Sequence, residues 1–164
     1  MRSRLSALLC FKKQMNEETK LLVDFDSGEI TSRDLVNWAV RKIEEGLESD
    51  SLNELAWQNN LSKSLARELY IRSTEELSLQ LGSREERLIL LAKKIAKNIV
   101  EKKKDINKGC SEITEISKEL DSPENLSVFE LLAHEQYDHE SLGITSKNIQ
   151  PSIIEEARKL ANET

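Results

Sequence analysis

The stretch from Arg84 to Lys104, REERLILLAKKIAKNIVEKKK, carries the clearest helical pattern in the chain. Its apolar residues recur every three or four positions, as they do on the buried side of a helix. They form two adjacent stripes, one of Leu88, Leu91, Ile95 and Ile99 and one of Ile89, Ala92, Ala96 and Val100. An apolar arc of this width indicates a helix that packs on more than one side. The stretch therefore predicts a helix that has more than one neighbour in an all-α fold.

Start and stop signals divide the rest of the chain into similar segments. A hydroxyl side chain three residues before a carboxylate can form a capping box at the first turn of a helix. Such pairs are Thr31 and Asp34, Ser51 and Glu54, and Ser83 and Glu86, and Ser122-Pro123 offers a fourth start with proline at the first helical position. The expected C-terminal glycines are Gly28, Gly46, Gly82 and Gly109. With the apolar spacing, these signals predict helices over residues 16–26, 32–46, 52–59, 63–81, 84–104, 108–120, 123–138 and 151–162.

The length and composition fit one helical domain. The 164 residues, 38% of them apolar, are enough for a single core, and five glycines with two prolines argue against a disordered or turn-rich chain. No segment alternates apolar and polar residues like a strand that ends in a hairpin turn. Short connections favour antiparallel neighbours. We therefore expect residues 15–164 to form a single-domain antiparallel bundle of seven to eight helices, whose hairpins could stack as in a short solenoid.

The first fourteen residues differ from the rest of the chain. Residues 1–14 hold four basic and no acidic residues around the apolar run 5–11, which is too short for a secretory signal or a membrane span. We interpret them as a basic tail or a mis-annotated start, with Met15 as the other initiator. A weak membrane-surface anchor is the alternative. The two cysteines, Cys10 and Cys110, are typical of a reducing compartment, so we expect a cytoplasmic protein without a membrane partner.

Charge is distributed in blocks along the chain, whose formal net charge is −6. Residues 15–54 carry a net charge of −7, residues 62–109 carry +5, and residues 110–142 carry −8. One interpretation is that the basic block pairs with its acidic neighbours. The other is that the acidic blocks form a surface for a basic protein, because complementary charge speeds association and excludes wrong partners. The candidate contact residues are Asp24, Asp26, Glu29, Glu44, Glu45 and Glu48, together with Glu135, Asp138 and Glu140.

The two tryptophans have two possible roles. Trp38 and Trp57 fit either the core or an exposed anchor, because tryptophan dominates the energetic centres of protein interfaces. We add Trp38 to the candidate contact residues on the second interpretation.

No motif of catalysis, metal binding or cofactor binding is present. His134 and His139 are five residues apart, which places them about 140° apart around a helix, and no cysteine pair completes a zinc site. The sequence lacks a nucleophile elbow and a glycine-rich phosphate loop. We therefore expect no enzyme activity, no cofactor and no small-molecule substrate.

Residues 52–69, LNELAWQNNLSKSLAREL, resemble a helix-turn-helix motif. Asn60 could take the turn, and Lys63, Ser64 and Arg67 could then face a DNA groove. Asn59 is polar at a position that is usually apolar, and the flanking acidic blocks would repel phosphates. Nucleic acid is therefore an unlikely partner, and two ordinary helices with a polar turn are the simpler interpretation.

Four stretches are similar to a broad group of small helical bacterial proteins: residues 27–39 (SGEITSRDLVNWA), 91–96 (LAKKIA), 105–110 (DINKGC) and 153–157 (IIEEA). Several members of that group look like immunity proteins, which neutralise toxins of contact-dependent or colicin-like systems. The resemblance covers most of residues 20–162 and implies a protein that binds a toxin and carries no catalytic residue.

The main functional prediction is thus a non-catalytic module that occludes the basic surface of a protein partner, such as a nuclease toxin. A helix-turn-helix regulator and a structural or adaptor domain are the alternatives.

Overall fold

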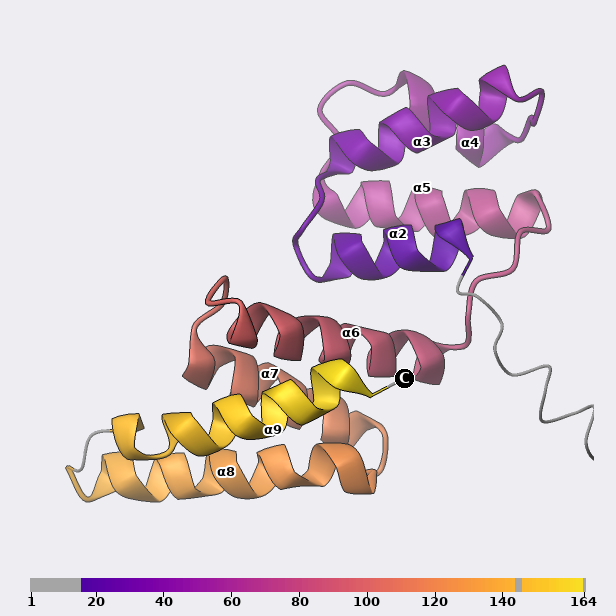
Figure 1. Ribbon diagram of the computed structural model, residues 1–164. Helices are drawn as coiled ribbons and strands as arrows, with labels where there is room; N and C mark the ends of the chain where they lie inside the picture. Colours follow the sequence, from indigo (N-terminus) through magenta and orange to yellow (C-terminus); the bar gives the residue numbers. More distant parts are fainter. Residues whose placement is uncertain (1–15, 144–145, 164) are drawn as a thin grey trace, which may run out of the picture. The chain divides into compact units, whose positions relative to one another are not determined.

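The computed structural model describes residues 16–143 and 146–163, and every regular element in these ranges is helical (Figure 1). The all-α prediction is confirmed. The predicted basic tail, residues 1–14, lies outside the described residues. The helices are α2 (Glu17–Asp26), α3 (Ser32–Glu44), α4 (Asp50–Trp57), α5 (Lys63–Glu76), α6 (Arg84–Val100), α7 (Ile106–Glu119), α8 (Glu124–Ser141) and α9 (Gln150–Asn162), with a short 3-10 helix, η1 (Ser146–Asn148), before α9. Within the described ranges, no helix has both the length and the apolar character to cross a membrane.

The chain divides after Ser83 into two compact units. Unit 1 contains α2 to α5 and unit 2 contains α6 to α9, and each has its own cluster of buried apolar side chains. The sequence predicts one domain over residues 15–164, whereas the structure has two cores. Helical periodicity shows which face of each helix is buried, but it does not show which helices share a core.

Unit 1 is built around an aromatic pair. The rings of Trp38 in α3 and Tyr70 in α5 meet edge to face with their centroids 4.6 Å apart. The Tyr70 hydroxyl donates a hydrogen bond to the backbone carbonyl of Glu18 at 2.8 Å, which ties α5 to α2. Trp38 is only 2% exposed, so its prediction as a partner-contact residue is wrong. Its apolar neighbours in α3 place it on the buried face, and its ring fills the core of unit 1.

The other tryptophan is the exposed one. Trp57 is the last residue of α4 and is 78% exposed, while Leu52 and Leu55 on the same helix are fully buried. Local sequence did not distinguish the two tryptophans, because both stand next to buried apolar residues.

In unit 2, α6 contributes its wide apolar arc to the core and contacts two other helices, as the arc predicts. Ala92, Ile95, Ala96 and Ile99 are buried, and residues of both predicted stripes contact the same cluster. Helix α6 packs on α7 and α9, and α8 packs on α7 and α9 from the other side (Figure 1). The wide apolar arc formed by the two stripes therefore allows α6 to pack against two neighbouring helices.

The helix starts follow the predicted signals in part. Thr31 and Asp34 form the predicted capping box, in which the Thr31 backbone N–H donates to Asp34 Oδ2 at 2.7 Å. Helix α4 instead begins with Ser49 as its N-cap, so Ser51 lies inside the first turn. Pro123 is the N-cap of α8 and not its first helical residue. The difference at α4 arises because Ser49 Oγ accepts from the Leu52 backbone N–H, an equally good cap two residues earlier.

Two helices end earlier than the glycines suggest. Gly28 and Gly46 have the positive φ of C-terminal glycines, +79° and +89°. Helix α5 ends at Glu76 and helix α6 at Val100, and the left-handed residues that follow them are Ser78 and Lys102. Gly82 and Gly109 are therefore not the stops of these helices.

Gly109 instead lies inside α7, where it faces α6. A Cβ atom at this position would stand 2.6 Å from Ile99 Cδ1 and 2.7 Å from Ile99 Cγ1. Ile99 is itself buried at 2% exposure, so it has little room to move. The missing side chain of Gly109 lets α6 and α7 approach closely.

We expect Trp38→Ala to loosen unit 1 selectively. Removing a large buried aromatic side chain costs about 3–5 kcal/mol, and the lost contacts belong to the unit 1 cluster. Native-state hydrogen exchange of the whole chain should show faster exchange in α3 and α5 and unchanged protection in α6 and α7. Phe129→Ala, in the core of unit 2, should give the reverse pattern. Equal losses in both units from either variant would contradict two separate cores.

We expect Gly109→Ala to destabilise the protein by about 1–3 kcal/mol, because the new methyl group collides with Ile99 in a packed core. This would outweigh the gain of about 1 kcal/mol that alanine brings to a helix. In denaturant unfolding, Ile99→Ala should absorb much of the penalty, so the double variant costs less than the sum of the single ones. Ser111→Ala, on the exposed side of α7, is the control for helix propensity. A stabilising Gly109→Ala would show that the helices are not closely packed here.

Candidate functional site

The predicted acidic contact residues do not form one surface. Asp24, Asp26 and Glu29 lie where α2 ends, and Glu44, Glu45 and Glu48 lie where α3 ends. A short loop joins the end of α2 to the start of α3. The first group therefore lies near the start of α3 and the second near its end, at opposite ends of unit 1. Glu135, Asp138 and Glu140 belong to α8 in unit 2. The structure therefore brings the predicted residues of unit 1 together only in threes, and on α8 Glu140 lies on the other side of the helix from Glu135 and Asp138.

Four helices bring acidic residues to one end of unit 1. The start of α2 meets the end of α3 through an ion pair between Arg41 and Glu17. The start of α4 meets the end of α5, where Ser51 Oγ donates to Glu76 Oε1 at 2.7 Å. Beyond α5, the Gly82 backbone N–H donates to Thr19 Oγ1 in α2 at 2.8 Å, which closes the ring. We call this surface the acidic end; its acidic residues are Glu17, Glu18, Glu44, Glu45, Glu48, Asp50, Glu75 and Glu76.

Lys42 holds the acidic end together. Its ammonium group lies 3.2 Å from Glu45, 3.4 Å from Glu18 and 4.0 Å from Glu17, and its side chain is only 12% exposed. Burial on its own would lower the pKa of Lys42, but the hydrogen bond to Glu45 and the charges of the three carboxylates raise it. Lys42 therefore stays protonated and offsets the repulsion between its carboxylate neighbours.

Glu76 completes the start of α4. The Ser51 backbone N–H donates to Glu76 Oε2 at 3.0 Å, so the carboxylate satisfies one of the free N–H groups of the first turn. Hydrogen bonds from the side chains of Ser51 and Ser49 and from the Ser51 backbone lower the pKa of Glu76. The charged form of Glu76 is thus the one that links α5 to α4.

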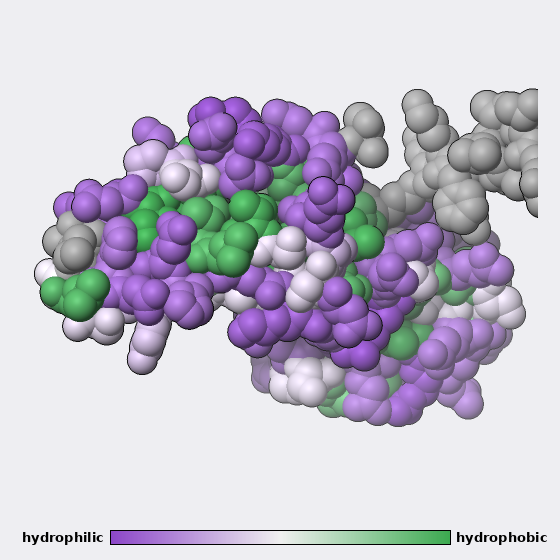
Figure 2. Space-filling view, turned by 90° about the horizontal axis from the view of Figure 1, so that it is seen from below, coloured by the Kyte–Doolittle hydropathy of each residue, from purple (hydrophilic) through white to green (hydrophobic). Residues whose placement is uncertain are grey.

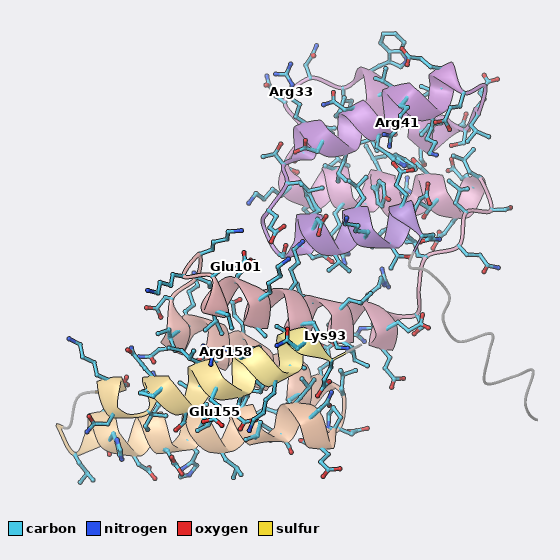
Figure 3. The ribbon with its side chains drawn as sticks, in the orientation of Figure 1. Arg33, Arg41, Lys93, Glu101, Glu155 and Arg158 are labelled. Atoms are coloured by element: carbon cyan, nitrogen blue, oxygen red, sulfur yellow. The ribbon has the colours of Figure 1, made fainter. Side chains whose placement is uncertain are left out.

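Several carboxylates at the acidic end face solvent. Glu44, Glu48, Asp50 and Glu75 are exposed, and among the described residues the structure records no ion pair for them. Arg41, labelled in Figure 3, lies at this end of α3, whereas Arg33 lies at its other end. The acidic end can therefore offer free carboxylates to a cationic partner beside others that are already neutralised.

Sequence reasoning missed most of this surface. Glu17, Glu18, Asp50, Glu75 and Glu76 were not predicted, and Glu75 and Glu76 lie in the block of net positive charge. A signal for them exists in the order of the helices, since the starts of α2 and α4 and the ends of α3 and α5 meet at one end when successive helices run antiparallel.

The opposite end of unit 1 carries the predicted helix-turn-helix. Helices α4 and α5 are joined by residues 58–62, with Asn60 at φ +62° as predicted for the turn. Arg67, however, donates from Nε and one Nη to the two carboxylate oxygens of Asp26 at 2.7 and 2.9 Å. The groove beside α5, of about 330 Å³, is lined by Ser64, Arg67, Glu68, Ile71, Arg72 and Glu75. A phosphate backbone in this groove would meet two carboxylates and two arginines, each of which is already paired with a carboxylate.

In unit 2, positive and negative side chains are interleaved. Lys104 forms an ion pair with Glu112 at 2.6 Å, and Arg84 pairs with Glu119. Figure 3 shows side chains of both signs on α6 and α9, among them Lys93 and Glu155. The two pairs join the basic block to the acidic block that follows it, as the first interpretation of the charge pattern expects.

Candidate groups for chemistry are few. His134 Nδ1 lies 3.1 Å from Asp138 Oδ2, on the exposed side of α8. In the part of the chain that the structure describes, no three His, Cys, Asp or Glu side chains are placed to hold a metal ion. Burial raises the pKa of the Cys110 thiol to about 11, which makes it a packing residue and not a nucleophile.

Comparisons of the chain with protein-family models, with curated proteins and with solved structures found no match. The resemblance to immunity proteins stays a prediction.

We expect Glu76→Gln to lower the stability of unit 1 near neutral pH and to flatten its acid dependence. A carboxyl whose pKa is lowered by folding stabilises the folded state above its ordinary pKa, and this contribution is lost as the pH falls. The free energy of unfolding of the wild type should thus approach that of Glu76→Gln below about pH 4.5. Urea unfolding between about pH 7 and about pH 3 measures this. Glu75→Gln makes the same change at the neighbouring exposed position, and a difference as large for it would refute the role of the serine contacts.

Proposed function

We propose that this chain is a non-catalytic protein-binding module that neutralises a basic toxin, as immunity proteins do, and that the acidic end of unit 1 is its contact surface. The observation that carries the proposal is the set of exposed carboxylates at that end, Glu44, Glu48, Asp50 and Glu75.

The charge of unit 1 supports this assignment. Residues 16–83 hold fourteen acidic and seven basic residues, a formal net charge of −7. A field of this sign attracts a cationic partner before contact and raises the association rate. The lysines and arginines of a nuclease that bind the phosphate backbone form a surface of the matching sign.

The arrangement of the carboxylates supports specificity. Helix ends that are tied by Lys42, Arg41 and Glu76 hold the exposed groups on a packed frame. With the backbone of these residues already held in place, binding has to order only their side chains. A partner would therefore be blocked by occupation of its basic surface, without any bond being made or broken.

The other acidic groups are less suitable. Asp26 is occupied by Arg67, and the groove beside α5 holds acidic and basic groups together. This observation also weighs against the helix-turn-helix alternative. The adaptor alternative predicts a partner that need not be basic and whose binding need not depend on the salt concentration.

We expect the tagged full chain to retain a basic protein at about 50 mM salt and to release it at about 500 mM, because the contact is electrostatic. The retained protein should be toxic when it is expressed alone and harmless when it is expressed with this chain. Glu44→Lys with Glu48→Lys should weaken the purified complex at least tenfold and abolish protection.

The matched control is Glu85→Lys with Glu115→Lys, which makes the same charge change on exposed residues of unit 2. The proposal fails if the two double variants weaken the complex equally, or if the retained protein is acidic or has no toxic activity that this chain suppresses.

A further inference from the structure

Helix α8 exposes large apolar side chains on the side that faces away from the core. Leu131 is 68% exposed and Leu142, which caps the helix, is 74% exposed. On the other side of the same helix, Leu126 and Phe129 are fully buried and Leu132 is 8% exposed. Single exposed leucines are ordinary, but two on one helix face form a pattern that needs a reason.

The two leucines belong to one stripe. At about 100° per residue, Leu131, Glu135, Asp138 and Leu142 fall within an arc of about 60° on α8. Their successive spacings of four, three and four residues are those of a helix that pairs lengthwise with another helix. Figure 2, which views unit 2 from its α8 side, shows green apolar areas that interrupt a mostly purple surface. We call these four residues the α8 stripe.

The middle of the stripe is acidic and open. Glu135 and Asp138 are exposed, and the recorded ion-pair contact of Asp138 is the local one with His134, whose side chain is 75% exposed. The stripe therefore presents an apolar residue, two carboxylates and a second apolar residue over about 16 Å of helix.

The order of apolar and acidic side chains along the α8 stripe determines which kind of partner it can bind. A second copy of α8 would place Glu135 and Asp138 against the same carboxylates, which repel one another across an interface. A helix with lysine or arginine opposite the carboxylates and apolar residues opposite the leucines matches every position. Lysine and arginine suit this role because their apolar stems can cover the leucines while the charged ends reach the carboxylates.

We infer that the α8 stripe is a docking surface for a cationic amphipathic helix of a partner protein. The surface lies on unit 2 and uses none of the residues of the acidic end, so the inference does not rest on the proposed function. A toxin could use it as a second contact, but any partner with such a helix fits it.

The probe is a synthetic peptide of about eighteen residues, long enough for five helical turns. It carries leucine at the outer positions and lysine at the inner positions of the same four-three-four spacing. A second peptide has glutamate in place of the lysines. Binding to the isotope-labelled full chain is followed by nuclear magnetic resonance, which reports both the affinity and the amides that respond.

We expect the lysine peptide to bind and to shift amides of α8 around Leu131 and Glu135, with an affinity that falls as salt is added. Glu135→Lys with Asp138→Lys should weaken binding at least tenfold, and Leu131→Ser should weaken it as well. The matched comparison is between Glu135→Lys alone, which should weaken binding, and Glu140→Lys, which makes the same charge change at an exposed residue on the same helix about 180° away from Leu131 and should not.

Each other outcome overturns the inference. It is wrong if the lysine peptide does not bind, if the glutamate peptide binds as tightly, or if Glu140→Lys weakens binding as much as the stripe variants. Shifts confined to the acidic end, removed by Glu44→Lys with Glu48→Lys, would overturn it while leaving the proposed function intact. A concentration-dependent dimer of the chain that loses its contacts in Leu131→Ser would show that the occupant is a second copy.

Discussion

The ammonium group of Lys42, almost enclosed by the carboxylates of Glu17, Glu18 and Glu45, is the interaction on which the acidic end of unit 1 depends. Like charges that gather at one end of a small protein repel one another and oppose folding. Lys42 and Arg41 offset this repulsion from within, and Ser51 stabilises the charge of Glu76 by hydrogen bonds. The same contacts tie α2 to α3 and α4 to α5. The side chains that form the acidic end therefore also hold the helices of unit 1 together.

Carboxylates that are paired within unit 1 and carboxylates that have no recorded ion pair therefore have different roles. Those that contact Lys42, Arg41 or Ser51 belong to the structure of unit 1, and Asp26 is likewise occupied by Arg67 at the other end. Those that are exposed and have no ion pair among the described residues, such as Glu44 and Glu48, are free to pair with a partner. A count of acidic residues along the chain does not separate these groups, because the separation is made by residues from other helices.

Helix α8 shows the same division on a single element. One face supplies Leu126 and Phe129 to the core of unit 2, and the other exposes Leu131 and Leu142 with two carboxylates between them. The helix is nearly apolar all round in its middle, which is why its sequence pattern does not reveal a solvent side. The fold does not account for the apolar side chains of its second face, which we propose as a docking surface.

The sequence by itself determined the helical class and most helix positions, because apolar spacing and capping residues act within a few residues of one another. The packing of α6 against two neighbouring helices and the capping box of Thr31 and Asp34 follow from such local signals. Only the tertiary structure decided that the helices form two cores, that Trp38 is buried and Trp57 exposed, and that Gly109 serves a close helix contact. It also decided which acidic residues share a surface, since Glu45 and Glu76 are distant in the chain and meet through the antiparallel order of four helices. Packing and charge pairing join residues that are close in space. A single sequence reveals such contacts only where the two residues are also close along the chain.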